Sequence, residues 1–594
     1  MVKIFIFQKK EYTINNFKFT LDWENEVLTE FKTFQYVNKL NNLNEKITLD
    51  YLAFPWATLL DLYCNKFKNF FSSFYSFLKS LNLLDGLPLN NRYITTIQSY
   101  HYLKFLDCFQ KIGIKYIFCP HIVKSFFLDI FFEYDLIILP YIIYPTVSNN
   151  NNKLEKNILY NFIGNIKYSV ERPTNIRTLI SELDHQDNTI VKVYNKWHFD
   201  DKVYGEQLKL INRKDSKKLR LEKENYYRKV MGESKFSICP LGIGPNSIRL
   251  WESLTYKTIP VSISDNLWLP FYLDVNWNKL IINMKESEYK NILNLDKISE
   301  EKINNFNIEG DKFYKEYLTE DKFGNLIEKA FENKFILLIP WYNILDKLRY
   351  DEIHKCLEHN LNNKIISKII FFYEVKDLTE VKYEIYNNPK IEIIPIITNK
   401  KRDISFNRII NYSNENLINN ICIISNNDIY FDDTLTNIKK LNFDQHNYFL
   451  ALTRKNCDLY LDKNKKVWKP HSASQDTWIF KSPIKKMKRE INLGWIQCDN
   501  IIAEAYHSLN YYVINPHYDI NCWHLHQYNN TDFLLENYNY NYKFPMKKIP
   551  LEYIEDIKEK KFIKEENNVF FNKLNGRLNV NGLSKLKKNW LSKN

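Results

Sequence analysis

The chain has 594 residues, which is too many for one ordinary globular domain and favours several domains. Hydrophobic residues make up 45% of it and charged residues 26%, close to the globular norm, which excludes wholesale disorder. Glycine occurs only 12 times, which excludes glycine-rich linkers and collagen-like architectures. Because glycine is so scarce, each remaining glycine is a candidate for a position whose backbone geometry requires it.

The chain is modestly basic, with 83 Lys and Arg residues against 70 Asp and Glu residues and a formal net charge of +13. The basic residues are dispersed rather than gathered into a stripe, so we expect no nucleic-acid partner. The excess suits nucleotide-linked substrates and peripheral association with an anionic membrane surface equally well.

Cysteine usage and the N-terminal sequence indicate a cytoplasmic protein. The nine cysteines form no CxxC pair, and the apolar stretch in MVKIFIFQKKEY is too short for an export signal, so we expect reduced thiols. The apolar segment 126–144 is interrupted by Asp129, Glu133 and Asp135. It therefore predicts a buried strand plus a connection, and no transmembrane segment is expected.

Over the first 270 residues, short apolar runs alternate with amphipathic stretches, which is typical of a mostly parallel sheet covered by helices. Strands are expected at 3–7, 116–119, 136–140, 161–163, 189–193, 236–239 and 259–264. Helices are expected at 100–112, 174–183, 216–232 and 247–256.

A second α/β alternation follows a stretch of charged, helix-favouring residues at 285–333. Its strands are expected at 334–340, 368–372, 391–397, 420–425, 448–452, 477–480 and 511–514. We therefore predict an α/β protein with domains at 1–150, 151–333 and 334–542, and a basic, peripheral C-terminal tail at 543–594.

Two of the rare glycines lie two residues apart in SKFSICPLGIGPNSIRLWESLTYKTIPVSISD, residues 234–265. We expect a strand, a glycine-containing loop, an N-cap at Ser247 and then a helix, a geometry that offers backbone N–H groups and a helix dipole to a diphosphate. Arg249 in the first turn would add a bidentate cation, and Glu252 would accept hydrogen bonds from a ribose or sugar hydroxyl. The alternative is an ordinary strand–helix turn with a surface Arg–Glu pair.

This segment resembles the exostosin-like glycosyltransferase motif, in which Cys-Pro at a strand end precedes a glycine-containing loop, Ser-x-Arg-Leu-x-Glu and Ile-Pro-Val. The matching residues are Cys239, Pro240, Gly242, Gly244, Ser247, Arg249, Leu250, Glu252, Ile259, Pro260 and Val261. Leu241 stands where many members carry Arg. Gly164, followed by Arg172 and Arg177, is similar to the opening of the family's second half.

The resemblance covers about residues 90–270 and implies a GT-B architecture, with two Rossmann-like halves and the nucleotide sugar on the second half. It implies inverting, metal-independent transfer. The residues that it implies for nucleotide-sugar binding are Gly164, Arg172, Gly242, Gly244, Asn246, Ser247, Arg249 and Glu252.

His101 and His121 are the candidates for the general base of this first site. Each lies near the end of an expected strand or the start of a helix, where site residues gather in open sheets. An imidazole titrates near working pH and could deprotonate an acceptor hydroxyl. The alternative for each is a structural histidine, which is the more common role of a lone histidine.

A second polar cluster follows the expected strand in ICIISNNDIYFDD, residues 421–433. Asn426 and Asp428 come directly after that strand, and a strand-end carboxylate is a typical partner of Mg²⁺ or Mn²⁺. The alternative is an ordinary Asn/Asp turn. Further along the chain, Asp476 begins another strand, and Asp499 begins a helix after Gly494.

These pieces look like a GT-A-type glycosyltransferase domain. The resemblance implies a metal site of Asp428, with Asn426 in place of the first acid, completed by His524 and His526. It implies Asp499 as base, with Asp476 supporting donor or acceptor. Arg402 and Arg408, expected on a helix before the acidic strand, would contact nucleotide phosphates, or else are solvated surface arginines.

Three functions remain open. The first is a bifunctional glycosyltransferase that takes UDP- or GDP-linked sugars and extends a glycan acceptor. In the second, one unit is active and the other is a non-catalytic glycan-binding or scaffolding module. The third is a nucleotide-binding or metal-dependent hydrolase unrelated to glycans, which the exostosin-like motif disfavours.

Overall fold

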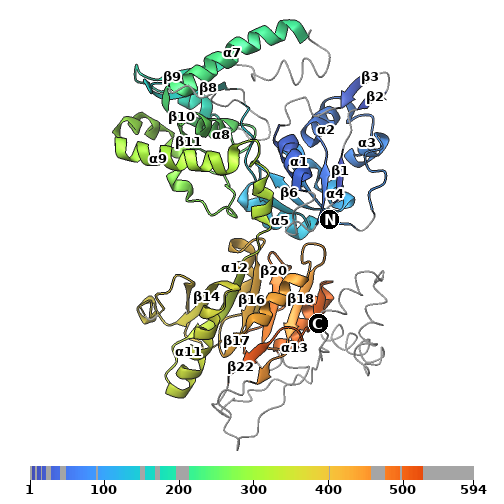
Figure 1. Cartoon of the computed structure of the whole chain (residues 1–594), viewed down its shortest axis with the longest axis vertical. Coiled ribbons are helices and arrows are strands. Elements are labelled where there is room, and N and C mark those ends of the chain that lie inside the picture. The colour runs from blue at the N-terminus through green and yellow to red at the C-terminus, as the bar shows by residue number, and fades with distance from the viewer. Residues whose placement is uncertain are drawn as a thin grey trace, which may run out of the picture. The chain divides into compact units, whose positions relative to one another are not determined.

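The computed structural model forms two compact units, unit 1 (Met1–Glu332) and unit 2 (Asn333–Asn594), so the chain divides next to the predicted boundary at 333 (Figure 1). The predicted tail at 543–594 lies outside the described residues. The structure describes residues 3–6, 10–14, 17–21, 28–40, 49–88, 91–146, 154–166, 174–194, 213–384, 386–400, 402–456, 475–494 and 498–525.

The first half of unit 1 is a five-stranded parallel sheet with the strand order β1-β4-β5-β6-β7. The strands are β1 (Ile4–Ile6), β4 (Asp50–Ala53), β5 (Tyr93–Thr96), β6 (Ile114–Cys119) and β7 (Ile137–Pro140). A separate hairpin is formed by β2 (Lys10–Ile14) and β3 (Phe17–Leu21). The helices are α1 (Leu28–Leu40), α2 (Trp56–Leu62), α3 (Phe74–Ser80), α4 (Leu106–Ile112) and α5 (Lys124–Tyr134).

Helix α5 corrects the prediction for the apolar segment 126–144. The strand β7 is present, but the residues before it are helical rather than strand or connection. The physical reason is the spacing: Phe127, Ile130 and Phe131 are buried, whereas Asp129 and Glu133 are exposed, as on an amphipathic helix.

The second half of unit 1 is also a five-stranded parallel sheet, with the order β12-β11-β10-β8-β9. Two parallel sheets covered by helices confirm the predicted α/β class with Rossmann-like halves. The strands are β8 (Ile158–Asn165), β9 (Ile190–Tyr194), β10 (Ser234–Pro240), β11 (Ile259–Ile263) and β12 (Ile282–Met284). The helices are α6 (Ile176–Ser181), α7 (Arg213–Glu233), α8 (Ile248–Thr255) and α9 (Glu300–Phe313).

The chain returns to the first half of unit 1 through α10 (Asn325–Ala330). The hydroxyl of Tyr36 on α1 donates to the Glu328 carboxylate, and the Phe331 ring lies 5.1 Å from the Tyr116 ring. The segment that closes the second half therefore packs on the first.

Unit 2 is built on a seven-stranded mixed sheet with the order β15-β14-β13-β16-β20-β18-β21. A three-stranded sheet, β17-β22-β19, lies in the same unit. The helices are α11 (Lys347–Asn362), α12 (Phe406–Asn416) and α13 (Cys498–Ser508). The strands are β13 (Phe335–Tyr342), β14 (Ile366–Val375), β15 (Ile391–Ile397), β16 (Ile421–Ser425), β17 (Ile429–Phe431), β18 (Tyr448–Leu452), β19 (Lys455–Asn456), β20 (Thr477–Lys481), β21 (Tyr512–Ile514) and β22 (Cys522–His524).

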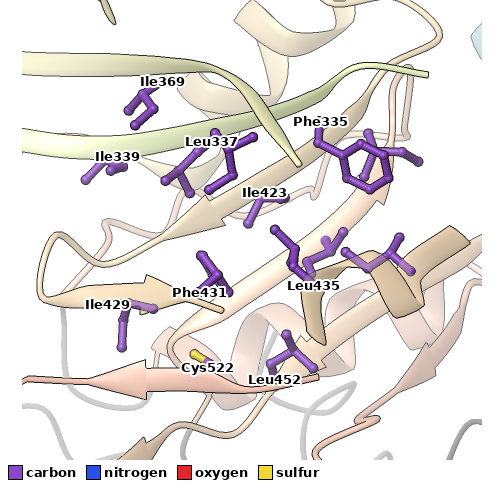
Figure 2. Packing of buried hydrophobic residues seen from close by; sticks show 14 of the residues in the cluster. Phe335, Leu337, Ile339, Ile369, Ile423, Ile429, Phe431, Leu435, Leu452 and Cys522 are labelled. Carbon is purple, nitrogen blue, oxygen red and sulfur yellow. The ribbon is translucent and has the colours of Figure 1, made fainter. Parts of the chain in front are cut away.

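Strand β13 is buried on both faces. Leu337 and Ile339 belong to the hydrophobic cluster in Figure 2, together with Ile423 of β16, whereas Ile336 and Leu338 belong to a second cluster. A strand covered on both faces has no polar alternation, which explains its continuous apolar run.

Two sequence expectations concern absences. Within the described ranges, every helix is too short or too polar to cross a bilayer. The cysteines in those ranges form no disulfide.

Candidate functional site

The glycine loop of unit 1 joins β10 to α8, as the sequence predicts. The Gly242 amide donates to the Gly244 carbonyl over 3.0 Å. A β-carbon at position 242 would lie 2.9 Å from the Nη2 atom of Arg177, and one at position 244 would collide with the His121 ring. Glycine is therefore required at position 244 by the His121 ring, whereas at position 242 a β-carbon would displace only the end of the Arg177 side chain.

His121 reaches this loop from the first half of unit 1, where it follows β6. His101 lies after β5, in a 3₁₀ helix (η2, Tyr100–Phe105) where α-helix was expected, and the Ser99 hydroxyl accepts from its amide over 3.2 Å. The Tyr100 ring is 6.5 Å from the His121 ring. Of the two candidate bases, His121 is the one whose ring packs against the predicted donor loop.

Arg249 is buried, with 8% of its surface exposed, so it is not the surface arginine of the alternative interpretation. Its Nη1 atom donates to the Ile238 carbonyl over 3.3 Å, and Nη2 donates to the Ile163 carbonyl. The guanidinium lies 5.0 Å from the centre of the Phe162 ring. Its Nε atom is buried and has no hydrogen-bond partner among the described residues.

Arg177 on α6 lies beside Arg249. The sequence motif includes this residue but assigns it no function. Its Nε atom donates to the Leu241 carbonyl over 2.9 Å, and Nη1 donates to the Asn165 carbonyl over 2.8 Å. Burial, and then the charge of Arg249, lower the pKa of Arg177 to about 9. A buried guanidinium, that of Arg249, and a half-buried one, that of Arg177, thus lie side by side next to Leu241.

Glu252 is also buried, and both carboxylate oxygens accept hydrogen bonds within unit 1. Thr146 donates its hydroxyl to Oε1, and Tyr227 donates its hydroxyl to Oε2 over 2.8 Å. Burial raises the pKa of Glu252, although these two hydroxyls and Arg249 act in the opposite direction. A carboxylate has further lone pairs, so the expected sugar contact stays a prediction.

The other predicted donor residues differ in their surroundings. Asn246 accepts from the Trp251 indole over 3.0 Å and donates to the Tyr141 carbonyl over 3.4 Å, so its amide ties the loop to both halves. Ser247 is the N-cap of α8, but its side chain makes no capping hydrogen bond. A β-carbon on Gly164 would lie 3.3 Å from Arg249 Nη2. Arg172 lies outside the described residues.

In unit 2, Asp428 lies between β16 and β17 and is held by two basic side chains. Its Oδ2 atom accepts from Arg349 Nη2 over 2.7 Å and contacts His524 Nε2 at 3.3 Å. Burial alone raises the pKa of Asp428, but His524 and Arg349 outweigh it and hold the pKa well below its ordinary value. Its Oδ1 atom is buried and has no partner among the described residues.

Asp476 precedes β20 and lies beside Asn426. Its Oδ1 atom accepts from Asn426 Nδ2 and from Arg454 Nη1, both over 3.0 Å, and its buried Oδ2 atom has no partner among the described residues. Asp499 is close by on α13, where its Oδ2 atom accepts from the Gln475 amide over 3.0 Å. Burial, and to a lesser degree the charge of Asp476, raise the pKa of Asp499 to about 6, although the hydrogen bond from the Gln475 amide lowers it.

Among the described residues, the predicted Mg²⁺ or Mn²⁺ ligands come together only in part. Asp428 contacts His524 at 3.3 Å, whereas Asn426 binds Asp476, and His526 lies outside the described residues. No three His, Cys, Asp or Glu side chains converge in the described part of the chain. A divalent cation on Asp428 would be repelled by the Arg349 guanidinium already there. The described donors therefore do not make up a divalent-cation site, and metal binding by unit 2 stays a prediction.

Of the two predicted arginines of unit 2, Arg408 lies on a helix as expected and Arg402 does not. Arg402 is not on a helix: it precedes α12, has a φ of +56°, and donates from Nη1 to the Gly494 carbonyl over 3.0 Å. Arg408 is on α12 and exposed. The arginines that pair with the acidic residues are Arg349, with Asp428, and Arg454, with Asp476. In the local sequence, only the i, i+3 spacing of Arg349 and Glu352 could have indicated such a pairing.

Comparison with known proteins confirms the exostosin-like resemblance for part of unit 1. Residues 125–300 match the Exostosin GT47 domain. A probable glucuronosyltransferase of Oryza sativa subsp. japonica is 35% identical over 106 residues, 18% of this chain and 23% of that protein. A probable glucuronoxylan glucuronosyltransferase of Arabidopsis thaliana is 39% identical over 66 residues, 11% of this chain and 14% of that protein. The chain thus spans less than a quarter of the length of these relatives.

Similarity to solved structures is low. TarS of S. aureus is 11% identical with a TM-score of 0.24, over 32% of this chain and 60% of that chain. TarM of S. aureus is 13% identical with a TM-score of 0.26, over 55% of this chain and 62% of that chain. The description of the fold therefore rests on the sheets of the structure itself. The GT-A assignment of unit 2 stays a prediction.

Proposed function

We propose that this protein is a glycosyltransferase and that the glycine loop of unit 1 binds the diphosphate of a nucleotide-sugar donor. The match of residues 125–300 to the Exostosin GT47 domain supports the class of reaction. The observation that carries the site is the pair of buried Arg249 and half-buried Arg177 beside the loop. Two guanidinium groups side by side favour a bound anion, and the start of α8 adds backbone N–H groups.

In this proposal the acceptor is a glycan hydroxyl, and His121 is the group placed to take its proton. Its ring lies against the donor loop, so a hydroxyl near the loop would be within its reach. The two arginines would stabilise the charge that develops on the departing diphosphate. This chemistry needs no metal in unit 1. The relatives are named glucuronosyltransferases, which makes UDP-glucuronic acid the first donor to test.

Unit 2 would carry a second transfer, which makes the protein bifunctional. Asp499 supports this proposal because a carboxylate with a pKa of about 6 suits a general base near neutral pH. The other candidate, a non-catalytic glycan-binding module, is favoured by the ion pairs that hold Asp428 and Asp476. Metal assistance in this unit remains a prediction, which a comparison of Mn²⁺ with EDTA would test.

The test is transfer from UDP- and GDP-linked sugars by the full-length chain, with UDP affinity measured alongside. Arg249→Met should lower UDP affinity about tenfold or more, because a charge-assisted contact is lost. Ser247→Ala is a second variant of the proposed site. The Ser247 hydroxyl makes no capping hydrogen bond, so its removal should leave the fold intact. Arg228→Met, which removes a helix-surface pair with Glu224, is the control. Full transfer by folded Arg249→Met would refute the proposed site.

A further inference from the structure

Unit 2 contains several buried oxygen atoms that have no hydrogen-bond partner among the described residues, and three of them are Asp428 Oδ1, Asp476 Oδ2 and Asn500 Oδ1. The three residues are 8%, 6% and 5% exposed. Buried polar atoms nearly always have a partner, because an unpaired one loses its hydration without compensation. All three atoms are acceptors, so the missing partner is a hydrogen-bond donor or a cation.

The three residues belong to one region, which we call the acceptor corner. The Asn426 amide donates to the Asp476 carbonyl over 3.2 Å, which joins the end of β16 to the start of β20. Asn500 Nδ2 donates to Asp499 over 3.2 Å, and Asp499 in turn accepts from the residue before Asp476. Burial, and also the charges of Asp476 and Asp428, raise the pKa of the Cys522 thiol, so both carboxylates are within electrostatic reach of one side chain.

Two guanidinium groups and four carboxylates lie at or next to the acceptor corner. Arg349 pairs with Asp428 and Arg454 pairs with Asp476, each through the carboxylate oxygen that is not orphaned. Arg349 also pairs with Glu352, and the Asp499 carboxylate lies beside Asp476. A metal ion or ammonium group at the orphaned oxygens would meet both guanidinium groups as well as the carboxylates. Hydroxyl groups donate hydrogen bonds without adding charge.

We propose that the acceptor corner binds a sugar ring, with Asp428 Oδ1, Asp476 Oδ2 and Asn500 Oδ1 accepting hydrogen bonds from its hydroxyls. A pyranose carries several hydroxyls at fixed spacing, which matches a set of orphaned acceptors better than a single donor does. The ring belongs either to a nucleotide-sugar donor or to a glycan acceptor. This inference deepens the proposed function of unit 2 and rests on its being a carbohydrate site.

The test is hydrogen–deuterium exchange of the full-length chain, followed in peptides that cover 421–431, 475–481 and 498–508. The probes, each with EDTA, are UDP, UDP-glucose, UDP-N-acetylglucosamine, UDP-glucuronic acid, GDP-mannose, and xylan or glucan oligosaccharides, with MnCl₂ alone as a separate arm. We expect at least one sugar-bearing probe to protect all three peptides, and UDP alone to protect them less. Protection by a nucleotide sugar would identify the ring as part of the donor, and protection by an oligosaccharide would identify it as part of the glycan acceptor.

Variants assign the protection to the orphaned oxygens. Asp476→Asn should lower the affinity for the protecting probe about tenfold or more, since a hydrogen bond to a buried carboxylate is lost. Asn500→Ala breaks no ion pair and keeps the test valid if Asp476→Asn unfolds. Asp433→Asn, at an exposed acid near Asp428, is the control and should bind as wild type.

Two results would overturn the inference. One is protection by MnCl₂ alone that Asp428→Asn abolishes, which would make the corner a metal site. The other is no protection by any sugar-bearing probe. Peptides that cover 234–256 report on unit 1 in the same samples, so failure of the proposed donor site there is seen separately from failure at the acceptor corner.

Discussion

At the scale of single residues, the glycine loop of unit 1 is shaped by side chains far away in sequence. Position 244 must be glycine because the His121 ring fills the place of a β-carbon, and position 242 is similarly close to Arg177. The scarcity of glycine predicts that these positions matter. The two side chains that need the space depend on tertiary proximity and have no signal in the local sequence.

Gly244→Ala should destabilise unit 1 and displace His121. The new methyl group collides with the imidazole, and such overpacking costs about 1–3 kcal/mol. Thermal unfolding measures the loss. The double variant Gly244→Ala/His121→Ala should recover most of it, because the collision partner is gone.

Gly310→Ala is the matched control for that substitution. Gly310 lies inside α9, and a β-carbon there would meet only the Leu254 side chain at 3.4 Å, an ordinary contact. Alanine is the better helix former, so this variant should gain about 0.5–1 kcal/mol. Equal losses for the two glycine variants would contradict the specific contact with His121.

Asp499 predicts a pH-dependent contribution to the stability of unit 2. Its folded-state pKa of about 6 lies above its ordinary value, so ionising it opposes folding. The opposition is absent below about pH 4, where Asp499 is protonated in both states, and grows as pH rises to about 6. The Asp499→Asn variant lacks this unfavourable ionisation. Between pH 4 and pH 7 its free energy of unfolding should therefore rise relative to wild type by up to about 3 kcal/mol.

The measurement for Asp499 is the difference in unfolding temperature between variant and wild type at several pH values. Asp433→Asn, at an exposed acid in the same unit, is the comparison. A difference for Asp499→Asn that does not change with pH would show that the Asp499 carboxyl titrates alike in the folded and unfolded chain.

At the scale of elements, the sequence predicts best where one pattern dominates. The continuous apolar run at 334–340 predicts a strand, and β13 confirms it. The structure adds that this strand is buried on both faces. Strands β4 and β5 have four residues each and no clear alternation, so they are not predicted. Helix α5 is not predicted, because the segment 126–144 is interpreted as a buried strand plus a connection, although its charges recur with helical spacing.

The candidate sites show the same limit at the level of side-chain pairing. The sequence places Asp428, Asp476 and Asp499 at strand or helix ends, where the structure has them. It cannot show that Arg349, from a helix 79 residues earlier, pairs with Asp428, because that contact arises only when α11 packs on β17.

At the scale of the whole molecule, the described hydrophobic clusters each lie within one of the two units. The clusters around β13 and β16 contain residues of unit 2 only, and the clusters around β6 and β10 contain residues of unit 1 only. Cooperative unfolding follows shared buried surface, so we expect two separate unfolding transitions.

Matched core truncations would test this separation. Leu52 on β4 and Leu337 on β13 are both fully buried leucines of central strands, and each loses about 2–5 kcal/mol when truncated to alanine. In calorimetry of the full-length chain, Leu52→Ala should lower one transition by several degrees and Leu337→Ala should lower the other. Because the two leucines share no cluster, neither variant should move the second transition. A single transition that both variants lower would mean that the units unfold as one, and ligand binding at the glycine loop would then also stabilise unit 2.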